Sequence, residues 1–164
     1  MSKFLTAPLL AFALIATSLP ALAQGTSIAF GGLSLDGSLP VEIGADSLQV
    51  DQATGKAVFE GNVDIVQGPM RLVANRVEVI YAEDGGEIAR LLASGDVTLA
   101  NGDEAVEAQN AEYDLTTSQV ILTGNVLLTQ AGGIISGERV VVDLATGTGR
   151  VDGRVRTVLQ PGSE

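Results

Sequence analysis

The residues of this chain that could carry out chemistry are its carboxylates, because the sequence contains no histidine and no cysteine. Histidine is the usual general base, and both residues are common metal ligands. Three aspartates recur with a threonine three positions later, at Asp51, Asp114 and Asp143. Carboxylates could serve a polysaccharide-cleaving enzyme, but an aspartate just before turn residues is typical of turn capping. We therefore predict turn capping here, and no enzymatic activity, metal site or cofactor.

Arginines gather near the carboxyl end of an otherwise acidic chain. The sequence has 9 basic and 20 acidic side chains, a formal net charge of −11, and such a surface repels nucleic acid. On one extended strand, the even spacing of Arg150, Arg154 and Arg156 would place them on one face. These arginines could dock an acidic partner, or they could keep an exposed edge soluble. We predict docking, with no role for nucleic acid.

The first 23 residues have the features of a secretory signal peptide. Lys3 gives a positive start, residues 4–14 are almost wholly apolar, and Ala21 and Ala23 fit the cleavage positions. The apolar run is short for a membrane span of about 20 residues. We expect cleavage after Ala23 and an exported mature chain, residues 24–164, that forms a single domain.

A repeated phrase organises the mature chain. The tripeptide G-[ND]-V recurs at residues 61–63, 95–97 and 124–126, with Gly-Arg-Val at 153–155 as a weaker fourth copy. A small residue follows each of the first three glycines by 13 positions, at Ala74, Ala108 and Gly137. A unit of 29 residues, present about four times with one insertion near residues 82–86, accounts for this spacing.

Within each unit apolar residues alternate with polar ones, which predicts strands with one apolar face. Turn residues at the midpoints, such as Asn101-Gly102, predict hairpins between successive strands. The chain therefore reads as an all-β antiparallel meander with strands at about 46–51, 56–66, 70–81, 87–100, 104–115, 118–129, 133–144 and 148–159.

If each repeat glycine pairs with the small residue that follows it, a row of small residues crosses the sheet. Glycine inside a strand marks a bend or bulge, so we expect the sheet to fold over along this row into two facing walls. The interior would be either a filled sandwich core or a lumen, and the low aromatic content of 4% favours the lumen. Segments 27–35 and 150–159 would leave unpaired edges that permit stacking.

The stretch ADSLQVDQATGKAVFEGNVDIVQGPMRLVANRVEVIY, residues 45–81, resembles the opening repeats of the LptA/OstA family of periplasmic lipopolysaccharide transport proteins. The resemblance covers about residues 40–160. It implies an open, twisted β-jellyroll whose hydrophobic groove holds the lipid A acyl chains of lipopolysaccharide. It also implies head-to-tail self-association and contacts with an LptC-like inner-membrane protein and an LptD-like outer-membrane protein.

The inward parity of the strands and this resemblance together predict a lipid-binding groove. Its expected lining is Leu48, Val50, Phe59, Val63, Ile65, Val77, Val79, Tyr81, Leu91, Val97, Leu99, Tyr113, Leu122, Val126, Leu128, Val140, Val142 and Val155. The expected function is a periplasmic carrier or bridge for lipopolysaccharide between the two membranes. The alternative is an exported structural scaffold that stacks through edge strands and binds no lipid.

Overall fold

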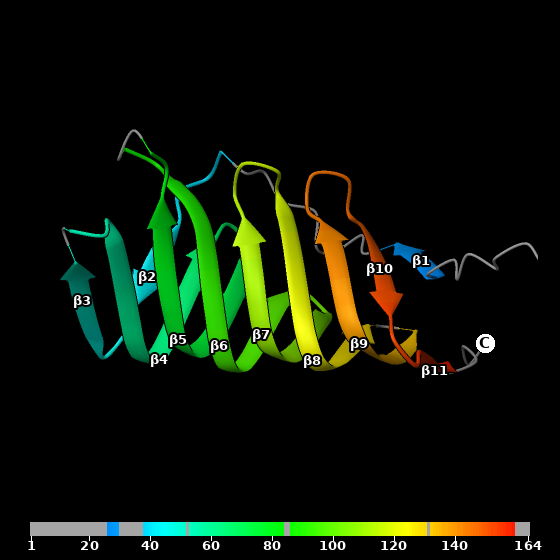
Figure 1. Cartoon of the computed structure of the whole chain (residues 1–164). Helices are drawn as coiled ribbons and strands as arrows, with labels where there is room; N and C mark the ends of the chain where they lie inside the picture. Colours follow the sequence, from blue (N-terminus) through cyan, green and yellow to red (C-terminus); the bar gives the residue numbers. More distant parts are fainter. Residues whose placement is uncertain (1–25, 30–37, 52, 84–85, 131, 160–164) are drawn as a thin grey trace, which may run out of the picture.

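The computed structural model describes residues 26–29, 38–51, 53–83, 86–130 and 132–159, the first range by its backbone alone. Those residues form one antiparallel sheet, in the order β1-β10-β9-β8-β7-β6-β5-β4-β2, with β3 also on β4 and β11 also on β9 (Figure 1). The strands are β1 (Thr26–Ala29), β2 (Glu42–Gly44), β3 (Ser47–Asp51), β4 (Lys56–Gln67), β5 (Met70–Tyr81), β6 (Ile88–Asn101), β7 (Glu104–Asp114), β8 (Gln119–Gln130), β9 (Gly133–Asp143), β10 (Thr148–Asp152) and β11 (Arg156–Leu159). In the described part of the chain, no helix has the length and apolar character needed to cross a membrane.

The all-β meander predicted from the sequence is confirmed, and most strand ends agree within one residue. The last predicted strand, 148–159, is divided into β10 and β11 by residues 153–155. The predicted signal peptide lies outside the described residues, so cleavage after Ala23 stays a prediction.

The repeated glycine and the residue after it form a bulge that bends the sheet. Both have positive φ: Gly61 and Asn62 at 80° and 45°, Gly95 and Asp96 at 79° and 48°. Asparagine and aspartate tolerate this left-handed region better than other side chains, which explains the G-[ND] pattern. The same pair of positive φ angles occurs at Gly124-Asn125 and Gly153-Arg154.

The bulge corrects the predicted register. The repeat glycine does not pair with the small residue. Instead, the valine two positions later does, as in Val63 with Ala74 and Val97 with Ala108. Because a bulge adds an unpaired residue to one strand, the predicted centres of the β4–β5 and β6–β7 turns are one residue too early. The β6–β7 turn is therefore Gly102-Asp103, between the paired Asn101 and Glu104.

Each bulge glycine is covered by the side chain that follows a small residue of a neighbouring strand or segment, Ala45 being the small residue that precedes Asp46. A Cβ added at Gly61 would lie 2.5 Å from a carboxylate oxygen of Asp46, and one at Gly95 would lie 2.8 Å from Nδ2 of Asn75. Hydrogen bonds tie the same residues together, since Asn62 donates to Asp46 at 2.8 Å. Only glycine fits such a position, so the repeat encodes this bend.

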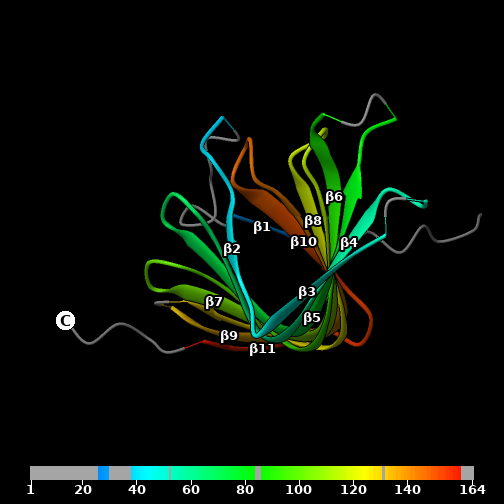
Figure 2. The same cartoon turned by 90° about the vertical axis from the view of Figure 1, so that its left-hand side faces the viewer.

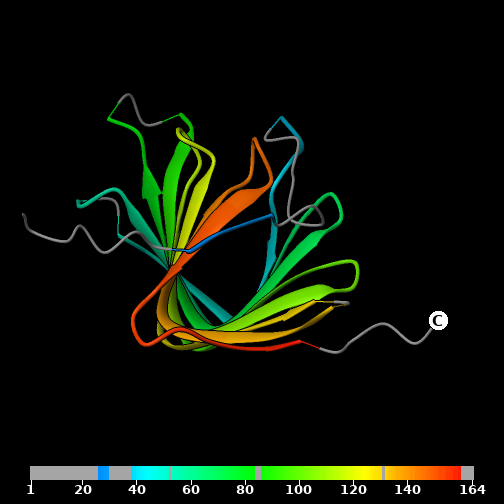
Figure 3. The same ribbon diagram turned by 90° about the vertical axis from the view of Figure 1, so that its right-hand side faces the viewer.

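The bulge row divides the sheet into two walls, visible end-on in Figure 2 and from the opposite end in Figure 3. The first wall holds β3, β10, β1 and the segments such as 56–60 and 110–114. The second holds β2, β11 and segments such as 63–67 and 104–108. Apolar side chains of both walls fill the space between them.

The end of the sheet that carries β10 differs from the prediction. We expected residues 27–35 and 150–159 to leave two separate unpaired edges. Instead β1 lies on β10, with Ser27 opposite Arg150, while residues 30–35 lie outside the described part of the chain. The amino-terminal strand β1 therefore pairs with β10 near the carboxyl end of the chain. No local sequence pattern encodes this long-range contact. The terminal strands are β1 and β11 at this end, and β2 and β3 at the other.

Candidate functional site

The candidate site is the inner face of the folded sheet. Thirteen of the predicted groove residues are almost inaccessible to solvent, with exposed fractions between 0% and 3%: Val63, Ile65, Val77, Val79, Leu91, Val97, Leu99, Tyr113, Leu122, Val126, Leu128, Val140 and Val142. Phe59 is partly buried and packs against them. Cross-strand pairs such as Val79 with Leu91 and Leu91 with Tyr113 continue this face from strand to strand.

In β4, β6 and β8, which contain the bulges, the buried residues keep one parity along the whole strand. In the strands between them, β5, β7 and β9, the parity of the buried residues changes at the bend. In β5 the buried residues are Leu72 and Ala74, then Val77 and Val79. The inner face thus changes from even to odd positions at the bend. In β6, Leu91, Val97 and Leu99 keep the same parity, because the extra bulge residue compensates for the bend.

The interior of the described fold is filled by these side chains. A residue such as Leu99 or Val142 with 0% exposure has no room for a water-sized neighbour beside it. Accommodating an acyl chain therefore requires the walls or side chains to move apart.

At both ends the inner apolar face continues beyond the covered region. Leu48 and Val50 lie opposite Phe59 and Ala57, on the inner face of the first wall, yet they are 53% and 63% exposed. Tyr81 is 40% exposed, and with Val50 it lines an open pocket of about 690 Å³. Leu48 and Val50 are exposed because their strand, β3, is terminal and pairs with β4 alone.

At the β10 end, Val155 is 39% exposed and lies between β10 and β11. Leu159 on β11, opposite Gly133, is exposed as well, whereas Val158 lies opposite the exposed Ile134 and faces outward. The predicted groove residues are thus brought together on one face, with apolar side chains open to solvent at each end of it.

The sequence prediction missed the polar residues of the inner face. Gln67 has the parity of Val63 and Ile65 and is only 1% exposed. Its Nε2 donates to the backbone oxygen of Leu39 at 3.0 Å, and its Oε1 accepts from the hydroxyl of Tyr113 at 3.1 Å. This bond joins the second wall to the first across the interior. Gln67 could have been found from the sequence, because the period-two alternation of β4 gives it the same inward parity as Val63 and Ile65.

Burial raises the pKa of the Tyr113 hydroxyl above its usual value of 10.0, and its hydrogen bond to Gln67 opposes that shift. Desolvation disfavours the charged phenolate. Tyr113 is therefore a neutral hydrogen-bond donor inside an apolar face, a role that its inclusion among the apolar lining residues did not anticipate.

The aspartates singled out in the sequence cap turns, as predicted. Asp51 accepts from the backbone nitrogens of Ala53 and Thr54 at 2.9 and 3.3 Å. Asp114 and Asp143 each accept from the nitrogen three residues later at 3.0 Å. Hydrogen bonds from the Thr54 side chain and then from these backbone groups lower the pKa of Asp51, so its carboxylate is poorly suited to act as a proton donor.

Among the three predicted docking arginines, only Arg156 lacks an ion pair with another described side chain. Arg154 lies in the last bulge and donates twice to Glu138, at 2.6 and 2.9 Å. Arg150 donates to Asp152 at 3.0 Å. The bulge at residues 153–154 also interrupts the single extended strand on which all three would share a face, because Arg154 occupies a positive-φ position.

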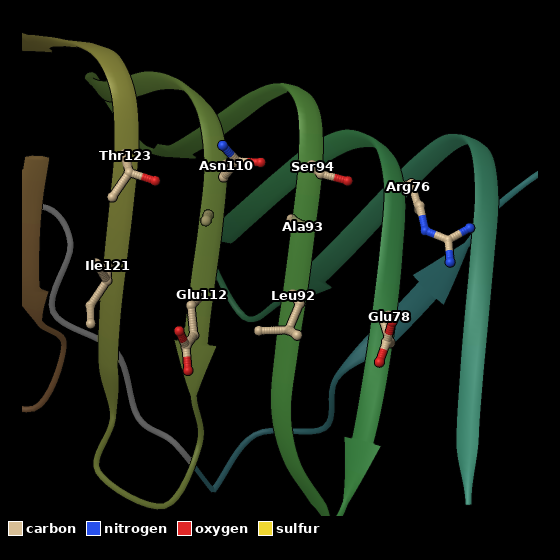
Figure 4. Close-up of a pocket in the computed structure, with 10 residues that line it drawn as sticks. Arg76, Glu78, Leu92, Ala93, Ser94, Asn110, Glu112, Ile121 and Thr123 are labelled. Atoms are coloured by element: carbon tan, nitrogen blue, oxygen red, sulfur yellow. The ribbon is translucent and has the colours of Figure 1, made fainter. Parts of the chain in front are cut away.

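The outward face carries cross-strand ion pairs and a shallow depression. Lys56 pairs with Glu78 at 2.7 Å, Arg90 pairs with Glu112 at 3.1 Å, and Arg76 pairs with Glu60. Figure 4 shows side chains of β5 to β8 around the depression, of about 300 Å³. Its charged groups are already paired, and it is separated from the inner face by the sheet, so it is distinct from the predicted groove.

Sequence comparisons relate the chain to one family of known proteins. Residues 42–148 match the family described as the LptA/(LptD N-terminal domain) LPS transport protein. The chain is 32% identical to the lipopolysaccharide export system protein LptA of Haemophilus influenzae, over 87% of this chain and 89% of that protein. It is 33% identical to the uncharacterized protein R00383 of Rhizobium meliloti, over 87% and 83% of the two chains.

The structural comparison shows the same architecture. The crystal structure of LptH, the LptA-homologous periplasmic component of the lipopolysaccharide transport device from Pseudomonas aeruginosa, superposes with a TM-score of 0.69 at 22% identity. The match covers 77% of this chain and 99% of that one, so the β-jellyroll prediction is confirmed. With a family match across most of the repeats, the chain belongs to the LptA/LptD amino-terminal-domain family of lipopolysaccharide transport proteins.

Proposed function

We propose that this protein is a periplasmic carrier that covers the acyl chains of lipopolysaccharide during export. The observation that carries the proposal is the apolar inner face, which continues through both walls and remains exposed at Leu48 and Val50 at one end and at Val155 at the other. Family membership supports the same ligand class, because the relatives are named for lipopolysaccharide export.

The energetic argument is that acyl chains cannot cross an aqueous compartment uncovered. Each exposed methylene costs about 0.8 kcal/mol, or roughly 10 kcal/mol for a chain of a dozen carbons. An inner face of Val, Leu and Ile side chains offers a cover of matching chemistry. Since burial has no direction, net movement needs a driving force from upstream of this protein.

The proposed partners are neighbours that join its two ends. Terminal strands β2 and β3 at one end, and β1 and β11 at the other, present edges suited to strand addition, and β3 and β11 carry exposed apolar residues. Further copies of this chain, an LptC-like inner-membrane protein and an LptD-like outer-membrane protein are the proposed occupants. Such contacts would continue the inner face from one protein to the next.

The test is binding of purified lipopolysaccharide to the mature chain carrying one glutamate on either face. Val63 is 0% exposed on the inner face, and Val73 is 37% exposed on the outward one. Val63→Glu buries a charge and is expected to reduce binding strongly, whereas Val73→Glu leaves it near wild type. Val97→Thr, which keeps the side-chain shape, tests the inner face if Val63→Glu does not fold.

The alternative scaffold function predicts a different result. A scaffold with a permanently filled core would bind no lipopolysaccharide in any form of the protein. Absence of lipid A species from protein extracted from its native envelope, together with no binding in vitro, would overturn the carrier proposal.

A further inference from the structure

Polar side chains form a row across the second wall, inside the apolar face. Cross-strand pairs connect Gln67 to Met70, Met70 to Asn101, and Asn101 to Glu104. Gln67 and Asn101 are buried, with 1% and 7% of their surface exposed. We name Gln67, Asn101, Glu104 and the facing Tyr113 the inner polar row.

Two acceptors in this row depend on donors that are scarce in the interior. Oε2 of Glu104 is buried and has no hydrogen-bond partner. Oε1 of Gln67 has the Tyr113 hydroxyl as its donor, at 3.1 Å across the gap between the walls. A buried acceptor that loses its donor carries the full cost of its desolvation.

A chain entering between the walls separates Gln67 from Tyr113, because their bond spans the space that the chain must occupy. A hydrocarbon offers nothing in return, and an ester or carbonyl oxygen can only accept. A hydroxyl or amide N–H on the lipid can donate to the Gln67 and Glu104 oxygens. The cost of opening therefore depends on the donors that the incoming lipid carries.

We propose that the inner polar row makes the interior selective for lipids whose acyl chains bear a hydrogen-bond donor, a hydroxyl or an amide, near their polar end. This inference rests on the proposed lipid-carrying function and names a chemical feature of the lipid. Selection works by rejection, since a chain without donors leaves buried oxygens unpaired. Ordinary ester-linked membrane phospholipids fall in the rejected class.

The test uses two probes that differ in one hydroxyl, the methyl esters of 3-hydroxytetradecanoic acid and of tetradecanoic acid. Their affinities for the mature chain are measured by displacement of a fluorescent lipid, and the ratio is compared among variants. For the wild type we expect the hydroxylated ester to bind about tenfold more tightly, equivalent to about 1.4 kcal/mol. Taking the ratio within one variant cancels changes in overall stability.

The informative variants remove the polar atoms and keep the volume. Gln67→Leu combined with Tyr113→Phe should lower the ratio toward one by improving binding of the plain ester, because no bond between the walls is then broken. Glu104→Leu should lower it by weakening binding of the hydroxylated ester, because the unpaired oxygen that could accept its hydroxyl is gone. Gln67→Leu alone removes the acceptor oxygen and serves if the double variant does not fold. Thr98→Val, which removes a hydroxyl and keeps the volume on the outward face of the same wall, opposite Val73, is the matched control and should keep the wild-type ratio.

The outcomes separate this inference from the carrier function. Equal binding of both esters by the wild type, or a ratio unchanged in every row variant, overturns the selectivity while leaving the carrier function in place. If the wild type binds neither lipopolysaccharide nor either ester, the carrier function itself is overturned.

Discussion

Replacing Gly95 by alanine should destabilise the protein far more than replacing Gly102, although both glycines have positive φ. Gly95 has a φ of 79° and lies in a bulge, where an added Cβ would be 2.8 Å from Nδ2 and 3.0 Å from Cβ of Asn75. Gly102 has a φ of 58° in the β6–β7 turn, with no atom within 4 Å of the added carbon. The pair separates the backbone cost of alanine from the cost of the close contact.

The backbone term is similar at the two sites. Alanine in the left-handed region costs about 1–2 kcal/mol, and the loss of unfolded-state freedom returns about 0.4–1 kcal/mol, which leaves about 1 kcal/mol. At Gly95, displacing Asn75 also weakens its 3.1 Å hydrogen bond to Asp96 and adds overpacking of about 1–3 kcal/mol. We expect a loss of about 2–4 kcal/mol for Gly95→Ala and about 1 kcal/mol for Gly102→Ala.

Thermal and urea unfolding of the mature chain, followed by far-ultraviolet circular dichroism, measure both losses. At about 2–4 °C per kcal/mol for a domain of this size, Gly95→Ala should melt several degrees below Gly102→Ala. Adding Asn75→Gly to Gly95→Ala should recover part of the loss, because it removes the clashing side chain. Equal losses for the two alanine variants, or no recovery in the double variant, would refute the role assigned to the bulge contact.

Two further predictions concern Tyr113 and the terminal arginine. The chain has two tyrosines and no tryptophan, so Tyr81→Phe leaves Tyr113 as the single reporter, and its absorbance should titrate above pH 10. Because burial raises its folded-state pKa, its contribution to stability should be complete below about pH 10 and decline as pH rises through the folded pKa. Titration at the ordinary value would contradict its burial. If the protein associates end to end, Arg156→Glu should lower the apparent size at high concentration, while Arg154→Glu, whose parent arginine is paired with Glu138, should do so less. An apparent size of Arg156→Glu that equals the wild type at every concentration would remove Arg156 from the interface.

The strands could be predicted from the sequence because each carries its own local signal. Period-two alternation and turn residues such as Gly68 and Gly102 are readable without knowing the partner strand, and the inner face follows from parity. The bulge was foreseen as a bend, but its register was not. The shift arises from the positive φ of both Gly61 and Asn62, and pairing by the glycine alone ignores the second residue.

Long-range and conformational features escaped the sequence for a different reason. The pairing of β1 with β10 joins opposite ends of the chain, and no local pattern records it. The bond between Gln67 and Tyr113 depends on how closely the walls approach, which alternation does not specify. Arg154 was grouped with Arg150 and Arg156 by spacing, whereas its position in the bulge pairs it with Glu138.

Lipid binding and end-to-end association rest on different forces, because the inner face is apolar and the exposed charges lie elsewhere. The outward face pairs many of its bases with acids of neighbouring strands, such as Arg71 with Asp64 at 2.7 Å, so few unpaired cations remain among the described residues to hold an anionic head group. The inner face is apolar apart from its polar row, so affinity for lipid has to come from burial, which moderate salt hardly changes. Contacts between exposed charges at the ends are screened over about 8–10 Å at physiological ionic strength. Salt should therefore weaken association through Arg156 while leaving lipid binding by the single domain nearly unchanged, because the two rest on different forces.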